Sequence, residues 1–548
     1  MKKEVKETLI ENLGIFTLFT LFIVMLNLAY NSLNYDIAWC FHISQKVANG
    51  YTMYSEISTV VTPIYFWIGG LFIKIFGNSL ISMAIYSGVV QGVIATTVYN
   101  ITKEVIEKKN DYLMPIFIFF MLQYSMILSL TNYNSTAMMW VLIAVFFELR
   151  REKTGKTKYN YITGIFLGLA FFTKQNIGTF AVIATGLISL INNLYFKKQN
   201  PMKEIFQKAA GFLGVMVIML IYFFTTGTFM NFIDFCVGGL LEFGAENFNP
   251  DFSAVFVVLI IIITISFCLA FDKKKPDNIL FIILIYLLGM FMIIYPLTNT
   301  YHAVLGMLLT LPLLIRVASK LQEHNDIYRI FLALTVLWSR MSINLFKAPK
   351  QTESENIFGD PMYILNAAIM ITTFVIFVIL IIGILKEKYE KTNKLILECV
   401  IVTILAIVCV HGYNLYINPD VPKGLEIYAN HGYTEKQMNY IETVINYILQ
   451  KEDEGYNVYV VSADASYYMA ALGRNNYKYD LTLYGSLGYN GEQRLIEETK
   501  QLKDPIILKD KNVMFQEPLE FDKYIKSNYK VIDQIENLVV YAHSGDVR

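Results

Sequence analysis

The sequence is poor in charge and lacks the short motifs of nucleotide-dependent and hydrolytic enzymes. Charged side chains make up 16% of the 548 residues, with 45 basic and 45 acidic residues. It contains no GxxxxGK[ST] phosphate loop, no HExxH helix and no GxSxG elbow. The balanced charge implies no nucleic-acid partner, and the missing phosphate loop leaves nucleotide-driven transport unsupported.

Cysteine is also scarce and shows no metal-ligand pattern. The five cysteines are scattered, without a CxxC pair, at Cys40, Cys236, Cys268, Cys399 and Cys409. Each is therefore expected to pack as a small hydrophobic side chain. A disulfide between Cys40 and Cys236 is the alternative to free thiols.

Hydrophobic residues, in contrast, are abundant. They form 55% of the chain, and the mean hydropathy is +0.45, which excludes a soluble globular protein and predicts a polytopic α-helical membrane protein. The first apolar run extends from Leu13 to about Tyr30 and has no small-residue cleavage site at its end, so we interpret it as a retained span. Further apolar runs, which bring the total to about thirteen spans, lie at about 79–101, 113–130, 136–149, 160–173, 177–195, 209–227, 252–271, 279–296, 303–315, 329–346, 362–385 and 395–413.

The distribution of Lys and Arg indicates which side each loop occupies. With the N-terminus in the cytoplasm and residues 62–77 not crossing, the inner segments carry roughly twenty-five basic residues. The outer loops between spans carry only five, Lys46, Lys74, Lys174, Lys347 and Lys350. Residues 62–77 are therefore expected to lie along the outer interface. The segment is short for a membrane span, and Pro63 lies at its start. In the alternative, this segment crosses and the N-terminus, with its lysines, is exported.

The residues after about 414 have the pattern of a small soluble α/β domain. Predicted strands are 458–462, 505–508, 530–535 and 538–541, and predicted helices are 435–450, 464–472 and 491–502. We therefore divide the chain into a transmembrane domain, 1–413, and an extracytoplasmic α/β domain, 414–548. The transmembrane domain includes a first outer loop with juxtamembrane helices at about 34–78.

Ionisable residues on the outer face are the candidates for chemistry, because such groups at membrane depth are costly and usually face a cavity. The candidates are Asp36, Glu56, Lys174, Asp234, Glu242, Glu246, Tyr301, His302 and Arg340. The alternative is that residues close to the end of a span reach the interface with their long side chains and have no further role.

Three stretches resemble a known family. These are YDIAWCFHISQKVANGYTMYSEISTVVTPIYFWIGGLFIKIFGNSL, TGIFLGLAFFTKQNIG and YPLTNTYHAVLG. They resemble polyprenyl-phosphate-sugar-dependent glycosyltransferases of the GT-C fold. Within this superfamily, their sequence pattern is most similar to that of the bacterial relatives of protein O-mannosyltransferases and aminoarabinose transferases. The matching positions are Asp36, Ala48–Gly50, Tyr54, Glu56 and Pro63–Tyr65. The chain departs from the family where Ile37 replaces a second acid and Thr62 replaces the first residue of a proline pair.

The resemblance implies an enzyme of the plasma membrane and cell envelope that transfers a sugar, with inversion, from an undecaprenyl-phosphate-like donor to an envelope acceptor. It implies no cofactor and no required metal ion. Asp36 is then the expected catalytic base, aided by Glu56, because the incoming hydroxyl must lose a proton. Lys174 and Arg340 are expected to neutralise the departing lipid phosphate, with His302 and Tyr301 as further donors.

Other functions remain open from the sequence. A secondary transporter or a flippase of lipid-linked saccharides would place charges at the membrane midplane, and such proteins often contain inverted repeats. An envelope polymer ligase or polymerase would use a donor that carries a chain of sugars. A non-catalytic membrane scaffold would tolerate the loss of Asp36. The identities of the sugar and of the acceptor do not follow from fold or motif.

Overall fold

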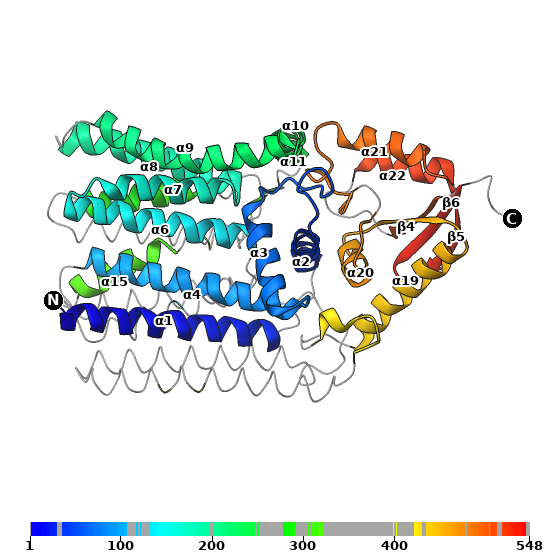
Figure 1. Ribbon diagram of the computed structural model, residues 1–548, viewed down its shortest axis with the longest axis horizontal. Coiled ribbons are helices and arrows are strands. Elements are labelled where there is room, and N and C mark those ends of the chain that lie inside the picture. Colours follow the sequence, from blue (N-terminus) through cyan, green and yellow to red (C-terminus); the bar gives the residue numbers. More distant parts are fainter. Residues whose placement is uncertain are drawn as a thin grey trace. The chain divides into compact units, whose positions relative to one another are not determined.

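The computed structural model describes the greater part of the chain (Figure 1). Apart from a few isolated positions, the described residues are 2–29, 35–106, 132–196, 201–246, 278–291, 308–321, 421–429, 435–476, 479–503, 505–511 and 518–543. They divide into two compact units. The first comprises Met1–Tyr30, Ser87–Met216 and Asn249–Asn414, and the second comprises Asn31–Tyr86, Val217–Phe248 and Leu415–Arg548.

The first unit is helical. The helices that lie in it wholly or for most of their length are α1 (Lys2–Ala29), α4 (Leu80–Val105), α6 (Tyr133–Thr154), α7 (Lys158–Phe171), α8 (Gln175–Phe196), α9 (Pro201–Thr225), α13 (Asn278–Phe291) and α15 (Thr310–Leu321). It also contains two paired strands of two residues each, β1 (Asn249–Pro250) and β2 (Leu297–Thr298). Within the described ranges, three segments are long and apolar enough to cross a membrane, Val5–Leu28, Leu80–Val105 and Met202–Thr225. The predicted runs at 113–130, 252–271, 329–346, 362–385 and 395–413 lie wholly or almost wholly outside the described residues, so the number of spans stays a prediction.

Local sequence signals explain where these helices end. The side chain of Asn132 accepts from the backbone N–H of Asn134, and Ser135 completes a capping box at the start of α6. Gly155, with φ +68°, ends the same helix in the left-handed conformation that glycine tolerates best. In the same unit, a buried ion pair joins Lys208 of α9 to Glu148 of α6 at 2.6 Å.

The N-terminal part of the second unit is a packed pair of short helices, α2 (Tyr35–Ala48) and α3 (Ile64–Phe76). Gly70 allows the two backbones to approach closely, because a Cβ at this position would lie 3.1 Å from the carbonyl oxygen of Ser44. With 13 residues, α3 is about 20 Å long, shorter than the ~30 Å hydrocarbon core of a bilayer. Its length agrees with the expectation that residues 62–77 do not cross.

The C-terminal part of the second unit is an α/β fold. It contains η4 (Glu426–Tyr428), α19 (Glu435–Asp453), β3 (Asn457–Val461), α20 (Ala465–Leu472), α21 (Gly491–Lys500), β4 (Pro505–Asp510), α22 (Leu519–Asn528), β5 (Tyr529–Ile535) and β6 (Leu538–His543). Every predicted strand and helix of this region is present, and α22 is an element that the sequence did not predict. The strand order is β3-β4-β6-β5, with β3 and β4 parallel and the other pairs antiparallel.

The core of this α/β fold lies between the sheet and its helices. Tyr459 and Ile507 from the strands are buried together with Leu495 of α21 and Phe521 of α22. The same compact unit includes residues 31–86 and 217–248, so the C-terminal fold packs with the first outer loop and does not form a unit by itself.

Residues 217–248 supply a second helical segment to this unit. It consists of α10 (Phe229–Ile233), a π-helical turn η1 (Asp234–Gly238) and α11 (Gly239–Glu246). Cys236 in the π-helical turn and Cys40 in α2 are both buried, and neither forms a disulfide. The expectation of small, hydrophobic cysteines is therefore confirmed at these two positions, and the alternative of a Cys40–Cys236 disulfide is wrong.

Candidate active site

Asp36 lies in the first turn of α2. The residue is exposed to solvent over part of its surface. The surrounding protein nevertheless excludes water from much of its carboxyl group, and this desolvation raises the pKa of Asp36 above the ordinary value of 3.8. Among the described residues, no hydrogen bond or ion pair occupies this carboxyl group. Asp36 is thus an accessible acid with a raised proton affinity, which is the property a general base requires.

Glu56 makes a local contact instead. Its carboxylate oxygen Oε2 accepts from the backbone N–H of Thr52 at 2.7 Å and closes the turn after α2. The side chain is exposed, and its backbone carbonyl accepts from Nζ of Lys46 at 2.7 Å. Lys46 is ten residues beyond Asp36, about 15 Å along the helix, so Glu56 is attached at the far end of α2. Within the described residues, the structure shows no contact between the carboxylates of Asp36 and Glu56.

Tyr54 has a structural function that sequence reasoning did not assign. Its side chain is fully buried although its φ is +70°, a backbone conformation that is unusual outside glycine. The hydroxyl donates to the carbonyl of Val61 at 3.0 Å and accepts from Sγ of Cys236 at 3.4 Å, while the ring contacts Phe223 and Phe232. Tyr54 therefore fixes the first outer loop to the segment 229–246. Its place in the family-like stretch MYSE was the available signal.

The loop acids Asp234 and Glu242 also make structural contacts. Asp234 accepts from the guanidinium of Arg494 at 2.8 Å and from the backbone N–H of Tyr489 at 3.0 Å. Glu242 accepts from the backbone N–H of Asn490 at 2.6 Å. These contacts join residues 229–246 to the α/β fold and favour the structural interpretation of both acids. The side chain of Glu246 lies outside the described residues.

Lys174 occupies the turn between α7 and α8 in the first unit. It is partly buried, and its Nζ lies 4.5 Å from the centre of the ring of Tyr133, at the start of α6. The electrons of an aromatic face attract a cation, so this contact favours one position of the Lys174 side chain. The backbone of Lys174 accepts from the N–H of Gly178 at 3.0 Å, which begins α8. Three other predicted site residues, Tyr301, His302 and Arg340, lie outside the described residues.

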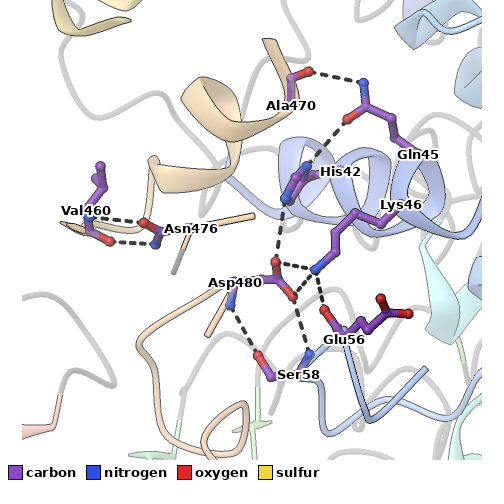
Figure 2. A network of polar contacts seen from close by, with 9 residues as sticks. All are labelled: His42, Gln45, Lys46, Glu56, Ser58, Val460, Ala470, Asn476 and Asp480. Atoms are coloured by element: carbon purple, nitrogen blue, oxygen red, sulfur yellow. Dashed lines mark hydrogen bonds and ion pairs between the residues drawn. The ribbon is translucent and has the colours of Figure 1, made fainter. Parts of the chain in front are cut away.

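A buried polar cluster was not predicted from the sequence (Figure 2). Oδ1 and Oδ2 of Asp480 accept from Nζ of Lys46 at 2.7 and 2.9 Å, and Nε2 of His42 lies 3.6 Å from Oδ1. Burial raises the pKa of Asp480, but the His42 ring and the Lys46 ammonium outweigh this effect and hold the pKa below its ordinary value. The sequence marked Lys46 only as an outer charge, and Asp480 carried no signal.

The described residues provide no obvious metal centre. Among them, no group of three or more His, Cys, Asp or Glu side chains is placed to hold an ion.

Comparison with known proteins gives two positive results. Residues 60–229 match the model of a family described as dolichyl-phosphate-mannose-protein mannosyltransferase. No curated protein sequence matches the chain. Among solved structures, ArnT from Cupriavidus metallidurans bound to undecaprenyl phosphate is similar, with a TM-score of 0.60 and 11% sequence identity, covering 100% of this chain and 99% of that one. ArnT from the same organism in the apo state gives a TM-score of 0.58 and 12% identity, covering 99% and 98%.

Proposed function

We propose that this GT-C-fold glycosyltransferase, which is related over residues 60–229 to the dolichyl-phosphate-mannose-protein mannosyltransferases, transfers a sugar from a polyprenyl-phosphate donor to an envelope acceptor. The reaction takes place on the outer face of the plasma membrane. The N-terminus lies in the cytoplasm, and the C-terminal α/β region is extracytoplasmic. The observation that carries the proposal is Asp36, an accessible carboxyl group with a raised pKa at the start of α2.

Asp36 acts as the general base in a single displacement. It accepts the proton of the acceptor hydroxyl as the hydroxyl oxygen attacks the anomeric carbon of the sugar. The bond between this carbon and the phosphate oxygen breaks, and the lipid phosphate leaves with the bonding electron pair. Attack opposite the leaving group inverts the anomeric configuration. Glu56 assists from the same outer loop by holding the turn that follows α2.

Lys174 stabilises the phosphate as it leaves. The negative charge on the phosphate grows during bond cleavage, and a fixed, partly desolvated ammonium group interacts with it more strongly than a solvated one does. The contact with Tyr133 holds the Lys174 side chain at one place on the first unit. Arg340, His302 and Tyr301 are proposed from the sequence alone as further donors to the phosphate.

The experiment that tests this function is product analysis with the purified protein in liposomes. Undecaprenyl phosphates carrying single sugars are offered as donors, together with an envelope extract of the cells that make the protein. Release of undecaprenyl phosphate with a labelled acceptor supports the proposal. A donor that crosses the bilayer intact would show a flippase. In a parallel reaction with an oligosaccharide linked to undecaprenyl pyrophosphate, release of undecaprenyl pyrophosphate would show a ligase. Either result contradicts the proposal.

A further inference from the structure

Helix α2 carries charged and polar groups at both of its ends. Asp36 lies in its first turn, while Gln45 and Lys46 follow His42 by three and four residues, which places all three on one side of the helix. This side contacts residues more than 400 positions away in the sequence. Figure 2 shows His42, Gln45 and Lys46 directed at the segment that carries Ala470 and Asp480.

Asp480 is bound from several directions. It lies 2% exposed, and its carboxylate accepts from Lys46 of α2 and, at 3.3 Å, from the backbone N–H of Ser58 in the first outer loop. Its own backbone N–H donates to Oγ of Ser58 at 3.2 Å. Lys46 in turn donates to the backbone carbonyl of Glu56. One buried ion pair thus joins α2, the first outer loop and the C-terminal region.

The segment that presents Asp480 is itself attached to the sheet. Four residues earlier, the side chain of Asn476 accepts from the backbone N–H of Val460 at 3.0 Å and donates to its carbonyl at 2.8 Å (Figure 2). Val460 belongs to β3. A second link is made by Nε2 of Gln45, which donates to the carbonyl of Ala470 at 3.1 Å. The sheet therefore defines the position of the last turns of α2.

A buried ion pair contributes less to stability than its distances suggest, because both charges lose their hydration. Such pairs can contribute to structural specificity, since few other arrangements satisfy both charges. Here the arrangement determines the direction of α2. Because Asp36 lies about 15 Å along the helix from Lys46, a tilt of about 4° would displace it by about 1 Å. A displacement of this size can slow a positioned reaction by about 10²-fold.

We propose that Asp480 is a positioning residue for the transfer reaction, which orients α2 through Lys46 and so places Asp36. This inference rests on the proposed function. Through Asp480, the C-terminal α/β region takes part in forming the site at the start of α2. Asp480 itself does not contact the reacting atoms.

The pH dependence of transfer distinguishes positioning from a loss of folded protein. Desolvation is the only cause of the raised pKa of Asp36 among the described groups. When α2 is no longer held, the Asp36 carboxyl group gains water and its pKa falls toward the ordinary value. The acid limb of the pH–rate profile then shifts to lower pH, whereas loss of folded protein, corrected for the folded fraction measured at each pH, leaves the limb of the remaining folded protein in place.

The test compares Asp480→Asn with the wild-type protein and with a matched control. The control is Asp522→Asn, which breaks another buried ion pair of the α/β region, to Lys509 at 2.8 Å. Asp480→Asn is expected to lower the turnover by about 10²-fold and to shift the acid limb to lower pH, with undecaprenyl phosphate binding retained. Asp522→Asn is expected to lower thermal stability and leave the acid limb in place. An unshifted limb in Asp480→Asn would overturn the inference.

A second variant covers the case in which Asp480→Asn does not fold. In Lys46→Met/Asp480→Leu, no unpaired charge remains buried, so folding is expected. The contact of the residue-480 side chain with the backbone N–H of Ser58 and that of Lys46 with the carbonyl of Glu56 are lost, so the same shift of the limb is expected. Asp36→Asn separates the two proposals. If it retains transfer, Asp36 is not the base and the positioning role fails with it, whereas a wild-type rate and limb in both Asp480 variants, with Asp36→Asn inactive, refutes only the positioning role.

Discussion

The contact between α2 and α3 predicts a specific loss of stability in Gly70→Ala. A Cβ at this position would lie 2.9 Å from Cγ1 of Val47, 3.1 Å from the carbonyl oxygen of Ser44 and 3.2 Å from the backbone nitrogen of Ala48. Two of these atoms belong to the backbone of α2 and the third to a stiff β-branched side chain, so the helices must separate. Overpacking of this kind costs about 1–3 kcal/mol, and the higher helix propensity of alanine returns about 0.5–1 kcal/mol.

The net loss is therefore about 1 kcal/mol, which lowers the unfolding temperature by about 2–4 °C for a folding unit of 150–250 residues. Unfolding of the detergent-solubilised protein can be followed with a thiol-reactive fluorophore, because Cys40 on α2 and Cys236 are buried thiols that form no disulfide in the folded state. The control is Gly214→Ala in α9, where an added Cβ meets nothing within 4 Å, and its unfolding temperature should stay the same or rise. Equal unfolding temperatures for the two variants would refute the packing argument.

Three further predictions concern the phosphate site, the α/β region and the topology. Lys174→Ala should weaken the binding of undecaprenyl phosphate about 10–150-fold in a titration, as the loss of a charge-assisted hydrogen bond worth about 1.5–3 kcal/mol implies, and unchanged affinity would remove Lys174 from the phosphate site. Burial and the charge of Asp510 raise the pKa of Asp464 to about 6. The pKa of Asp464 is higher in the folded than in the unfolded state, so its contribution to folding stability is complete below pH 3.8 and is lost as the pH rises to about 6. Asp464→Asn should therefore raise the unfolding temperature at pH 7, and it should flatten the pH dependence of the unfolding temperature between pH 3.8 and about 6. A cysteine at the exposed position Glu56 should react with a membrane-impermeant maleimide added outside intact cells, beyond the labelling of the wild-type protein, and reaction only after lysis would reverse the topology.

The regular elements of the α/β region could be predicted because each carries its own periodic pattern. The run of Val458 to Ser462 and the segment after Pro505 alternate or bury their apolar side chains as strands do, and the structure contains β3 and β4 there. Helix α22 was missed because its sequence, LEFDKYIKSN, has few apolar residues and only Phe521 and Ile525 are fully buried in the core.

Hydropathy located the described helices of the first unit but not their ends. Helix α1 begins at Lys2 although the apolar run begins at Leu13, and α6 continues to Thr154 beyond the run that ends at 149. A helix can extend past the hydrocarbon core into the interface, where charged residues are accepted, so the apolar run marks only its central part.

The GT-C resemblance read from three stretches agrees with the family match over residues 60–229 and with the fold of ArnT, whereas the contacts that organise the outer loop could not be predicted. Asp36 and Glu56 were found by their place in a family-like stretch, and their roles remain proposals. Asp480 lies 434 residues from Lys46, and a single buried acid in an irregular segment has no periodic pattern that could reveal its partner. Only the folded structure brings the two charges together.

The most direct test of the central claim is the transfer rate of Asp36→Asn, measured in liposomes as undecaprenyl phosphate released from the donor that the wild-type protein uses. The amide keeps the size of the carboxylate but cannot accept the proton, so transfer should fall by about 10²–10⁴-fold with membrane insertion and undecaprenyl phosphate binding unchanged. A rate within a few-fold of wild type would contradict the assignment of Asp36 as the base.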